Sequence, residues 1–212
     1  MKEYIKCLRP HHWIKNILVF LPVIFNRSLF DGELAIKAVV GIAAFSFAAS
    51  AIYILNDMMD YEKDRAHPVK CRRPIASGKV RKEIAAAIGI VLTLLAMAVS
   101  WKIAGVMAVA MLFLYAVINV GYSMGLKNCP IVDVVILVMG FYGSAVTGIE
   151  ISNWLYLTII AFAFYFGLGK RRNELAGSGG KTRKVLQYYN NNFLDKNMYM
   201  CVALGIMFYS LW

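Results

Sequence analysis

The residues best suited to chemistry lie in segment 53–64, which reads YILNDMMDYEKD. Its acids Asp57, Asp60 and Asp64 are spaced i, i+3 and i+7, so a helix would bring them onto one face about one turn apart. Three neighbouring carboxylates repel one another unless a cation or a basic group compensates them. Mg²⁺ prefers carboxylate oxygens and completes its shell with water and substrate phosphates. We therefore predict that these three catalytic acids form a Mg²⁺ site.

A solvated helix end is the alternative interpretation, with the acids paired to Lys63 and Arg65. Against it, Asn56 and Asp57 lie inside the end of an apolar stretch. A polar pair at such a position costs free energy and indicates a function by default. We therefore favour the metal site.

The next segment, 67–78, carries the cations Lys70, Arg72 and Arg73 after a break at Pro68. Acids that hold a metal, followed by fixed cations, suit a diphosphate, whose charge must be neutralised on several oxygens. Ordinary cytoplasmic positive charge is the alternative. We prefer that alternative only for the three basic residues at 79, 81 and 82.

Three further segments carry candidate substrate-binding residues. Asp133 begins an apolar stretch, where an acid indicates function, although a helix N-terminus also favours an acid. Near the N-terminus, Trp13 is typical of an interfacial anchor, and Lys15 suits either a lipid phosphate or a substrate phosphate. The candidates in these segments are Lys15, Tyr122, Lys127, Asp133, Lys170 and Arg171.

The elements that must position these residues are membrane helices. Hydrophobic residues make up 60% of the 212-residue chain and the mean hydropathy is +0.60, whereas soluble domains are about 45–50% apolar. The predicted fold class is an all-α, polytopic transmembrane helical bundle. Its predicted spans are 17–30, 35–55, 84–101, 104–120, 132–149, 154–168 and 198–212, the first interrupted by Pro22.

Basic residues test this arrangement independently. Of the 23 Lys and Arg, 20 fall on alternate connections between the predicted spans, and only Arg27, Lys37 and Lys102 fall on the other side. Positive charge is enriched in cytoplasmic connections, so we predict a cytoplasmic N-terminus. This pattern explains the net charge of +11 without nucleic acid. It places all the candidate segments at the cytoplasmic face of an inner or plasma membrane.

The motif Asn-Asp-x-x-Asp-x-x-x-Asp after the second predicted span resembles the first aspartate-rich motif of the UbiA-type membrane prenyltransferase superfamily. The resemblance implies an all-helical fold of nine spans around a central cavity, with Mg²⁺ binding a diphosphate. With about seven spans, residues 1–212 are expected to form a single UbiA-like transmembrane domain that is incomplete at its C-terminal end.

Three other motifs, at 9–16, 67–78 and 169–175, are similar to the decaprenyl-phosphate phosphoribosyltransferase branch. The resemblance implies transfer of 5-phosphoribose from phosphoribosyl diphosphate to a polyprenyl phosphate, a membrane lipid, with release of diphosphate. The resemblance also implies that Asn56 and Asp60 bind Mg²⁺, with Asp57 and Asp64 assisting. On this resemblance, Tyr53, Lys70 and Lys127 would bind the phosphoribosyl diphosphate. Lys15 and Lys170 would contact phosphate groups of the donor or the lipid. A homo-oligomer is compatible with the sequence.

Two other functions stay open. The first is transfer of a prenyl group from its diphosphate to an aromatic or other acceptor, which a second aspartate-rich motif would favour. The later loop is basic instead. The second is a transporter or a lipid-binding scaffold, for which we expect charges in the middle of spans rather than at their ends.

Overall fold

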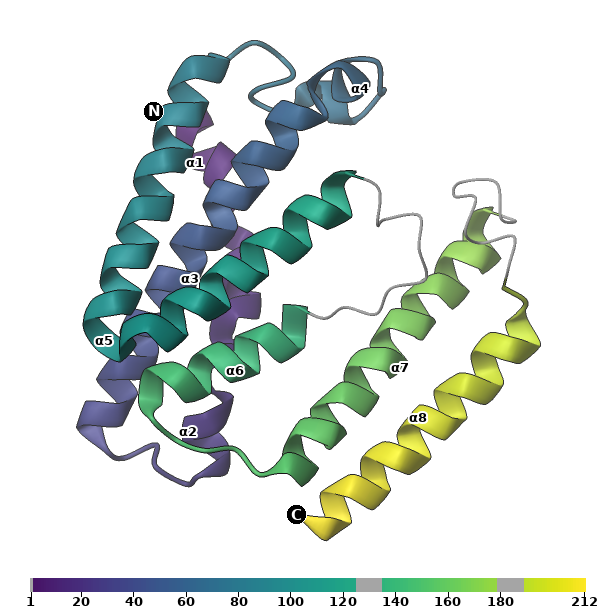
Figure 1. Ribbon diagram of the computed structural model, residues 1–212. Helices are drawn as coiled ribbons and strands as arrows, with labels where there is room; N and C mark the ends of the chain where they lie inside the picture. Colours follow the sequence, from purple (N-terminus) through teal and green to yellow (C-terminus); the bar gives the residue numbers. More distant parts are fainter. Residues whose placement is uncertain (1, 125–134, 179–188) are drawn as a thin grey trace. The chain divides into compact units, whose positions relative to one another are not determined.

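The computed structural model describes residues 2–124, 135–178 and 189–212. All regular structure in this part of the chain is helical (Figure 1), which confirms the predicted all-helical class. The elements, in chain order, are α1 (Lys2–Leu8), the 3₁₀ helix η1 (Pro10–Phe20), α2 (Leu21–Phe25), α3 (Gly32–Met59), α4 (Tyr61–Arg65), the 3₁₀ turn η2 (Lys70–Arg72), α5 (Lys82–Met124), α6 (Val135–Thr147), α7 (Asn153–Ser178) and α8 (Asn191–Leu211).

The chain divides into two compact units. The first comprises Met1–Val120 and Met139–Ile149, and the second comprises Gly121–Val138 and Glu150–Trp212. Among the described residues, two helices are long and apolar enough to cross a membrane, Gly32–Met59 and Lys82–Gly121. The count of about seven spans and the cytoplasmic N-terminus therefore stay predictions.

Helix α3 is the central element of the first unit. It begins at Asp31, whose carboxylate accepts hydrogen bonds from the backbone N–H groups of Glu33 and Leu34 at 3.0 and 3.2 Å. Its buried face is rich in alanine, glycine and serine, so neighbouring helices can approach it closely. The helix ends at Asp60, which places the acidic motif at its C-terminal end.

The first predicted span, 17–30, is not a single α-helix. Residues 10–20 form η1, the chain then enters α2 with Pro22 in its first turn, and it turns at Arg27, where φ is 56°. Proline is tolerated in a first turn because the N–H that it lacks would have no helical partner there. Buried hydrogen bonds attach η1 to α3: the Asn16 amide donates to the Ser46 hydroxyl at 2.8 Å.

Helix α5 contains both spans predicted for 84–101 and 104–120. Its backbone leaves the helical conformation at Gly105, with φ 65° and ψ −149°, a region that glycine adopts without a Cβ clash. The break therefore lies a few residues later than the sequence suggested. A cavity of about 430 Å³ with an almost entirely apolar lining lies between α3 and both parts of α5.

The core of the first unit includes an aromatic group contributed by α3, α5 and α6. The ring of Phe45 lies 4.5 Å from that of Tyr115 and 5.3 Å from that of Tyr142, measured between centroids. The Tyr142 hydroxyl is buried and hydrogen-bonded to that of Ser100 at 2.7 Å. These contacts join the later part of the first unit, 139–149, to its earlier helices.

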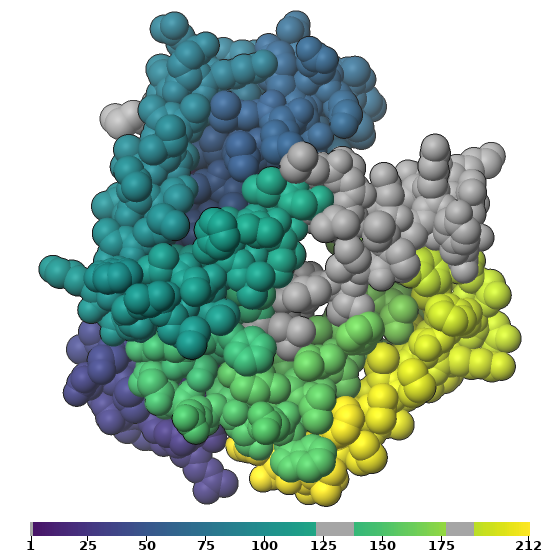
Figure 2. Space-filling view, viewed as in Figure 1, coloured from purple at the N-terminus to yellow at the C-terminus, as the bar shows by residue number. Residues whose placement is uncertain are grey.

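In the second unit, α7 and α8 lie side by side as an antiparallel pair (Figures 1 and 2). Small residues bring the two helices close together. A Cβ added to Gly205 would lie 3.3 Å from the Phe162 ring, and one added to Gly169 would lie 3.4 Å from the Met198 methyl. The predicted spans 154–168 and 198–212 fall within this pair.

Gly143, in the first unit, gives a test of how α6 packs against η1. A Cβ at Gly143 in α6 would clash with the carbonyl oxygen of Val19 in η1. We expect Gly143→Ala to lower the thermal unfolding midpoint by about 5 °C or more, because η1 must shift to admit the methyl group. Gly32→Ala is the control, since a Cβ there meets nothing within 4 Å. A Gly143→Ala protein as stable as the control would contradict the packing.

Candidate functional site

The acidic motif follows the C-terminal end of α3 into α4. Asp57 lies in the last turn of α3, Asp60 ends that helix, and Asp64 lies in α4. The backbone N–H of Asp60 donates to the carbonyl of Asn56 at 2.9 Å, and that of Asp64 donates to the carbonyl of Asp60 at 2.8 Å. These i→i+4 hydrogen bonds continue the helical path across the break at Asp60.

Arg73 joins two of these acids. Its Nη1 atom lies 3.0 Å from Oδ1 of Asp57 and 2.6 Å from Oδ2 of Asp64. Both carboxylate side chains are 3% exposed, so each needs a partner to remain charged. The cation that was predicted to meet a substrate thus contacts the motif itself.

Arg9 is a second partner, which the sequence interpretation did not single out. Its Nη2 atom lies 2.6 Å from Oδ1 of Asp57, and its guanidinium lies 5.1 Å from the centroid of the Tyr53 ring. The backbone of Arg9 is left-handed, with φ 51° and ψ 55°. This conformation is uncommon outside glycine, asparagine and aspartate. The strained turn between α1 and η1 aims the guanidinium at α3.

Trp13 follows in η1, and its indole N–H donates to the Ser50 hydroxyl on α3 at 2.9 Å. Ser50 in turn donates to the carbonyl of Leu8 at 2.9 Å. The indole thus fastens η1 and the end of α1 to α3. The role of Trp13 as an interfacial anchor stays a prediction.

Asp60 differs from its two neighbours. Its side chain is 22% exposed, and its ion-pair partner is Lys63 at 3.8 Å, whose side chain is 79% exposed. Such an exposed pair contributes little to stability. Asp60 is therefore the acid of the motif that a ligand from solution reaches most easily.

A magnesium site at this place has to be judged by its donors. In the described residues, no group of three or more His, Cys, Asp or Glu side chains is arranged to hold a metal ion. Mg²⁺ is commonly held by one or two carboxylates together with water and substrate phosphates. Asp60, with Asn56 one turn earlier on α3, fits that smaller donor set. The assignment of Asp57 and Asp64 as ligands stays a prediction.

Three predicted cations of the first unit are exposed, namely Lys15, Lys70 and Arg72. Within the part of the chain that the structure describes, none of them forms an ion pair with an acid. They differ in this from Arg9 and Arg73, so their charge is available for an anion.

Several predicted residues lie elsewhere. Lys127 and Asp133 are outside the described residues, and Tyr122 falls within the bounds of α5 with its side chain undescribed. Lys170 and Arg171 belong to the second unit, near the C-terminal end of α7. That they share a site with the acidic motif stays a prediction.

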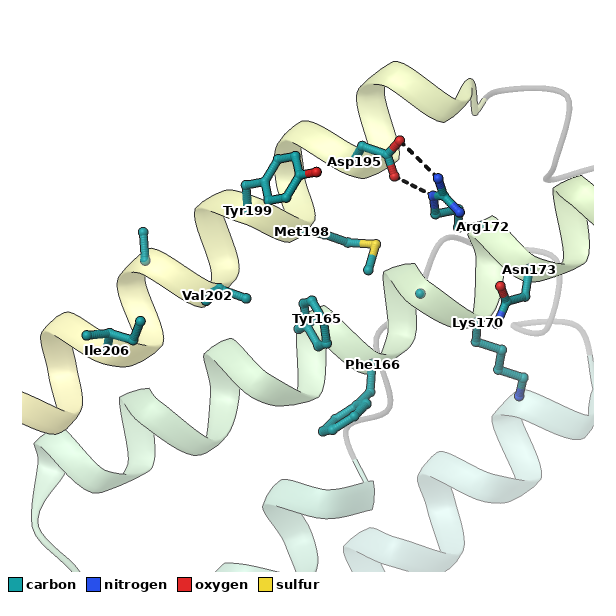
Figure 3. Close-up of a pocket in the computed structure, with 12 residues that line it drawn as sticks. Tyr165, Phe166, Lys170, Arg172, Asn173, Asp195, Met198, Tyr199, Val202 and Ile206 are labelled. Carbon is teal, nitrogen blue, oxygen red and sulfur yellow. Dashed lines mark hydrogen bonds and ion pairs between the residues drawn. The ribbon is translucent and has the colours of Figure 1, made fainter.

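The end of α7 borders a groove of about 890 Å³ that runs along α8. Arg172 reaches across to Asp195 on α8 with two hydrogen bonds, whereas Lys170 points away from Asp195 (Figure 3). Arg171 is buried and paired with Glu174 at 3.1 Å. Lys170 is therefore the more accessible of the two predicted residues here.

Residues 18–173 match the model of the UbiA prenyltransferase family. This stretch is well over half of the chain and contains the acidic motif and the cations that follow it, so the chain belongs to the UbiA prenyltransferase family. The fold agrees with a UbiA homologue from Archaeoglobus fulgidus bound to DMAPP and Mg²⁺, with a TM-score of 0.73 and 17% sequence identity. That match covers 99% of this chain and 77% of the homologue.

Curated relatives extend the similarity. The chain is 32% identical to a protein of Corynebacterium glutamicum and 33% identical to one of Mycolicibacterium smegmatis, both named decaprenyl-phosphate phosphoribosyltransferase. Each match covers 98% of this chain, and 66% and 69% of the relatives' lengths. A protoheme IX farnesyltransferase of Caulobacter vibrioides is 31% identical over 76% of this chain and 50% of its own length. The resemblance predicted from the motifs is thereby confirmed.

The histidine beside Tyr53 gives a test of the site's electrostatics. The pKa of His12 is lowered, first by burial and then by the charges of His11, Lys15 and Arg9. Below its usual pKa the unfolded chain therefore binds a proton that the folded chain resists, so stability falls as the pH falls through that range. We expect His12→Gln to reduce the loss of thermal stability between about pH 7.5 and pH 5.5. An unchanged pH profile would contradict this arrangement of charges.

Proposed function

We propose that this protein transfers 5-phosphoribose from phosphoribosyl diphosphate to a polyprenyl phosphate at the cytoplasmic face of a membrane, with Mg²⁺, and releases diphosphate. The observation that supports it most is the similarity over 98% of the chain to relatives named for this activity. The acidic motif and the exposed cations of the first unit supply the residue types that two anionic substrates require.

The reaction breaks the bond between C1 of the ribose and the diphosphate oxygen, and forms one between C1 and an oxygen of the lipid phosphate. Mg²⁺, when bound, neutralises charge on the leaving diphosphate. Asp60 and Asn56 are proposed to hold it. Lys70 is proposed to donate hydrogen bonds to the diphosphate, where charge grows as the bond breaks. The lipid phosphate is already an anion at neutral pH, so the acceptor needs no strong base.

The remaining site assignments are proposals of the same kind. Exposed Lys15 is proposed to meet a phosphate group. It lies on η1 three residues after His12, whose ring is 5.4 Å from that of Tyr53 between centroids, and it forms no ion pair among the described side chains. The other residues proposed to bind donor or acceptor are Tyr53, Arg72, Tyr122, Lys127, Asp133, Lys170 and Arg171. Arg73 is not among them, because it contacts Asp57 and Asp64.

We also propose that residues 1–212 belong to one multi-pass UbiA-like domain with a cytoplasmic N-terminus. The alternation of basic residues supports this orientation. It puts the acidic motif and the exposed cations beside it on the side where soluble phosphoribosyl diphosphate is found. The lipid tail then stays in the bilayer while its phosphate enters the site.

Prenyl transfer is the second candidate function. It is favoured by the family match and by the similarity to a protein named a farnesyltransferase. It needs one diphosphate and an acceptor without phosphate. The exposed cations make a site for two phosphate-bearing substrates the better explanation.

The activity is tested in membranes that contain the protein, with labelled phosphoribosyl diphosphate, polyprenyl phosphate and Mg²⁺. We expect a labelled lipid, and we expect Asp60→Asn to lower its formation by about 100-fold or more, the usual loss when a group that stabilises transition-state charge is removed. Glu62→Gln is the matched control, because this exposed carboxylate lies two residues further on and has no described partner. Parallel reactions contain a prenyl diphosphate with an aromatic acceptor.

Labelled lipid that depends on both Mg²⁺ and Asp60 would support phosphoribosyl transfer. Product only from the prenyl diphosphate would replace it by prenyl transfer. Folded protein without either product would rule out both candidates.

A further inference from the structure

Four charged side chains of the first unit form a closed cluster at the C-terminal end of α3. Arg9 and Arg73 both contact Oδ1 of Asp57, and Arg73 also contacts Oδ2 of Asp64. Two acids and two bases cancel formally, so this arginine cluster, as we call the four residues, needs no added cation to be neutral.

Burial makes this pairing matter. The side chains of Asp57 and Asp64 are 3% exposed, and those of Arg9 and Arg73 are 19% and 27% exposed. A buried charge that loses its partner is strongly destabilising. Arginine suits the position because its guanidinium is always charged and is more weakly hydrated than an ammonium, which favours it in buried ion pairs.

Both arginines are held at fixed points of the fold. Backbone hydrogen bonds close the segment after Arg73, from Ser77 to Arg73 at 2.8 Å and from Val80 to Pro74 at 3.0 Å. Ile75 and Val80 in that segment are buried in one cluster with Cys7 of α1 and Ile54 of α3. Arg9 is held by the attachment of η1 to α3 described above. The arginine cluster thus attaches the turn after α1, helix α4 and the segment after η2 to the C-terminal end of α3.

Asp60 lies between the two paired acids along the chain. Its backbone N–H bonds to the carbonyl of Asn56, and its carbonyl accepts from Asp64. Fixing Asp57 and Asp64 therefore fixes the backbone on both sides of Asp60, while its carboxylate stays partly exposed and weakly paired. The carboxylate of Asp60 is thus accessible, while Asp57 and Asp64 hold the backbone around it.

We propose that the aspartate-rich motif divides into two roles: Asp60 faces the metal and the diphosphate, while Arg9 and Arg73, through Asp57 and Asp64, are positioning residues. This rests on the proposed function only for the role of Asp60. In the alternative arrangement all three acids bind the metal, and their carboxylates would repel one another whenever the metal is absent. The two arrangements therefore differ in their stability without metal.

The sign of a stability change separates the two arrangements. Thermal unfolding is measured in detergent with a chelator, on the 212-residue chain. If the acids are paired with arginines, Asp57→Asn and Asp64→Asn lower the midpoint, and Arg73→Gln lowers it by roughly 10 °C. If the acids mainly repel one another, either Asn variant raises the midpoint, and that result would overturn the proposal. Arg81→Gln is the matched control, since its partner Glu83 is exposed.

One further variant and one metal addition test the role of the Arg73 guanidinium. Arg73→Lys keeps the charge on a compact and more strongly hydrated ammonium, so we expect only part of the stability to return. Mn²⁺ should raise the midpoint of Arg73→Gln more than that of the unsubstituted protein, because buried Asp64 has then lost its arginine and Asp57 keeps only Arg9. An Arg73→Gln protein as stable as Arg81→Gln, and indifferent to Mn²⁺, would contradict the cluster.

Metal binding is measured separately, by electron paramagnetic resonance of Mn²⁺ with inorganic diphosphate. We expect Asp60→Asn to abolish binding without lowering the metal-free midpoint. Asp57→Asn and Asp64→Asn should retain binding, weakened by about tenfold, as for residues that orient a ligand. Loss of binding in these two variants, without loss of metal-free stability, would make them ligands and refute the division of roles.

These measurements also separate the proposal from the proposed function. If the unsubstituted protein binds no Mn²⁺ with diphosphate, the proposed function and the role of Asp60 fail together. The metal-free midpoints still decide whether the arginine cluster holds Asp57 and Asp64.

Discussion

The structure of the first unit depends on how buried carboxylates are compensated at the end of an apolar helix. Asp57 and Asp64 are almost fully buried, and a carboxylate in such surroundings keeps its charge only beside a cation or several hydrogen-bond donors. Arg9 and Arg73 supply the cations from opposite sides in the sequence. The ion pairs with Asp57 and Asp64 therefore hold in place both the turn at Arg9 and the segment after η2.

This constraint also sorts the cations of the first unit. Arg9 and Arg73 are used by the fold, while the exposed Lys15, Lys70 and Arg72 have no acid partner among the described side chains. Sequence position alone does not separate the two groups, since Lys70 and Arg73 are three residues apart. The difference lies in burial. The guanidinium groups of Arg9 and Arg73 contact buried carboxylates, whereas the exposed cations are available to an anionic ligand. A reaction between two phosphate-bearing substrates draws on the second group.

Helix content and the position of the acidic motif could be predicted from the sequence because they depend on local pattern. Long apolar stretches and i, i+3, i+7 spacing are properties of neighbouring residues. The contact between Arg9 and Asp57 joins residues 48 positions apart and depends on a left-handed turn, so no local pattern indicates it. The bond from Trp13 to Ser50 escaped prediction for the same reason, because Ser50 lies on another helix.

Family membership constrains the fold more tightly than the chemistry. The chain shares its fold with a homologue at 17% identity, and it is about equally identical to relatives named for phosphoribosyl transfer and for farnesyl transfer. The diphosphate site proposed at the end of α3 would serve either reaction, and what distinguishes the two reactions is the charge of the acceptor. An acceptor with a phosphate needs additional cations that the fold itself does not consume. The substrate question therefore turns on exposed lysines such as Lys15 and Lys70 more than on the aspartates, which either reaction would use.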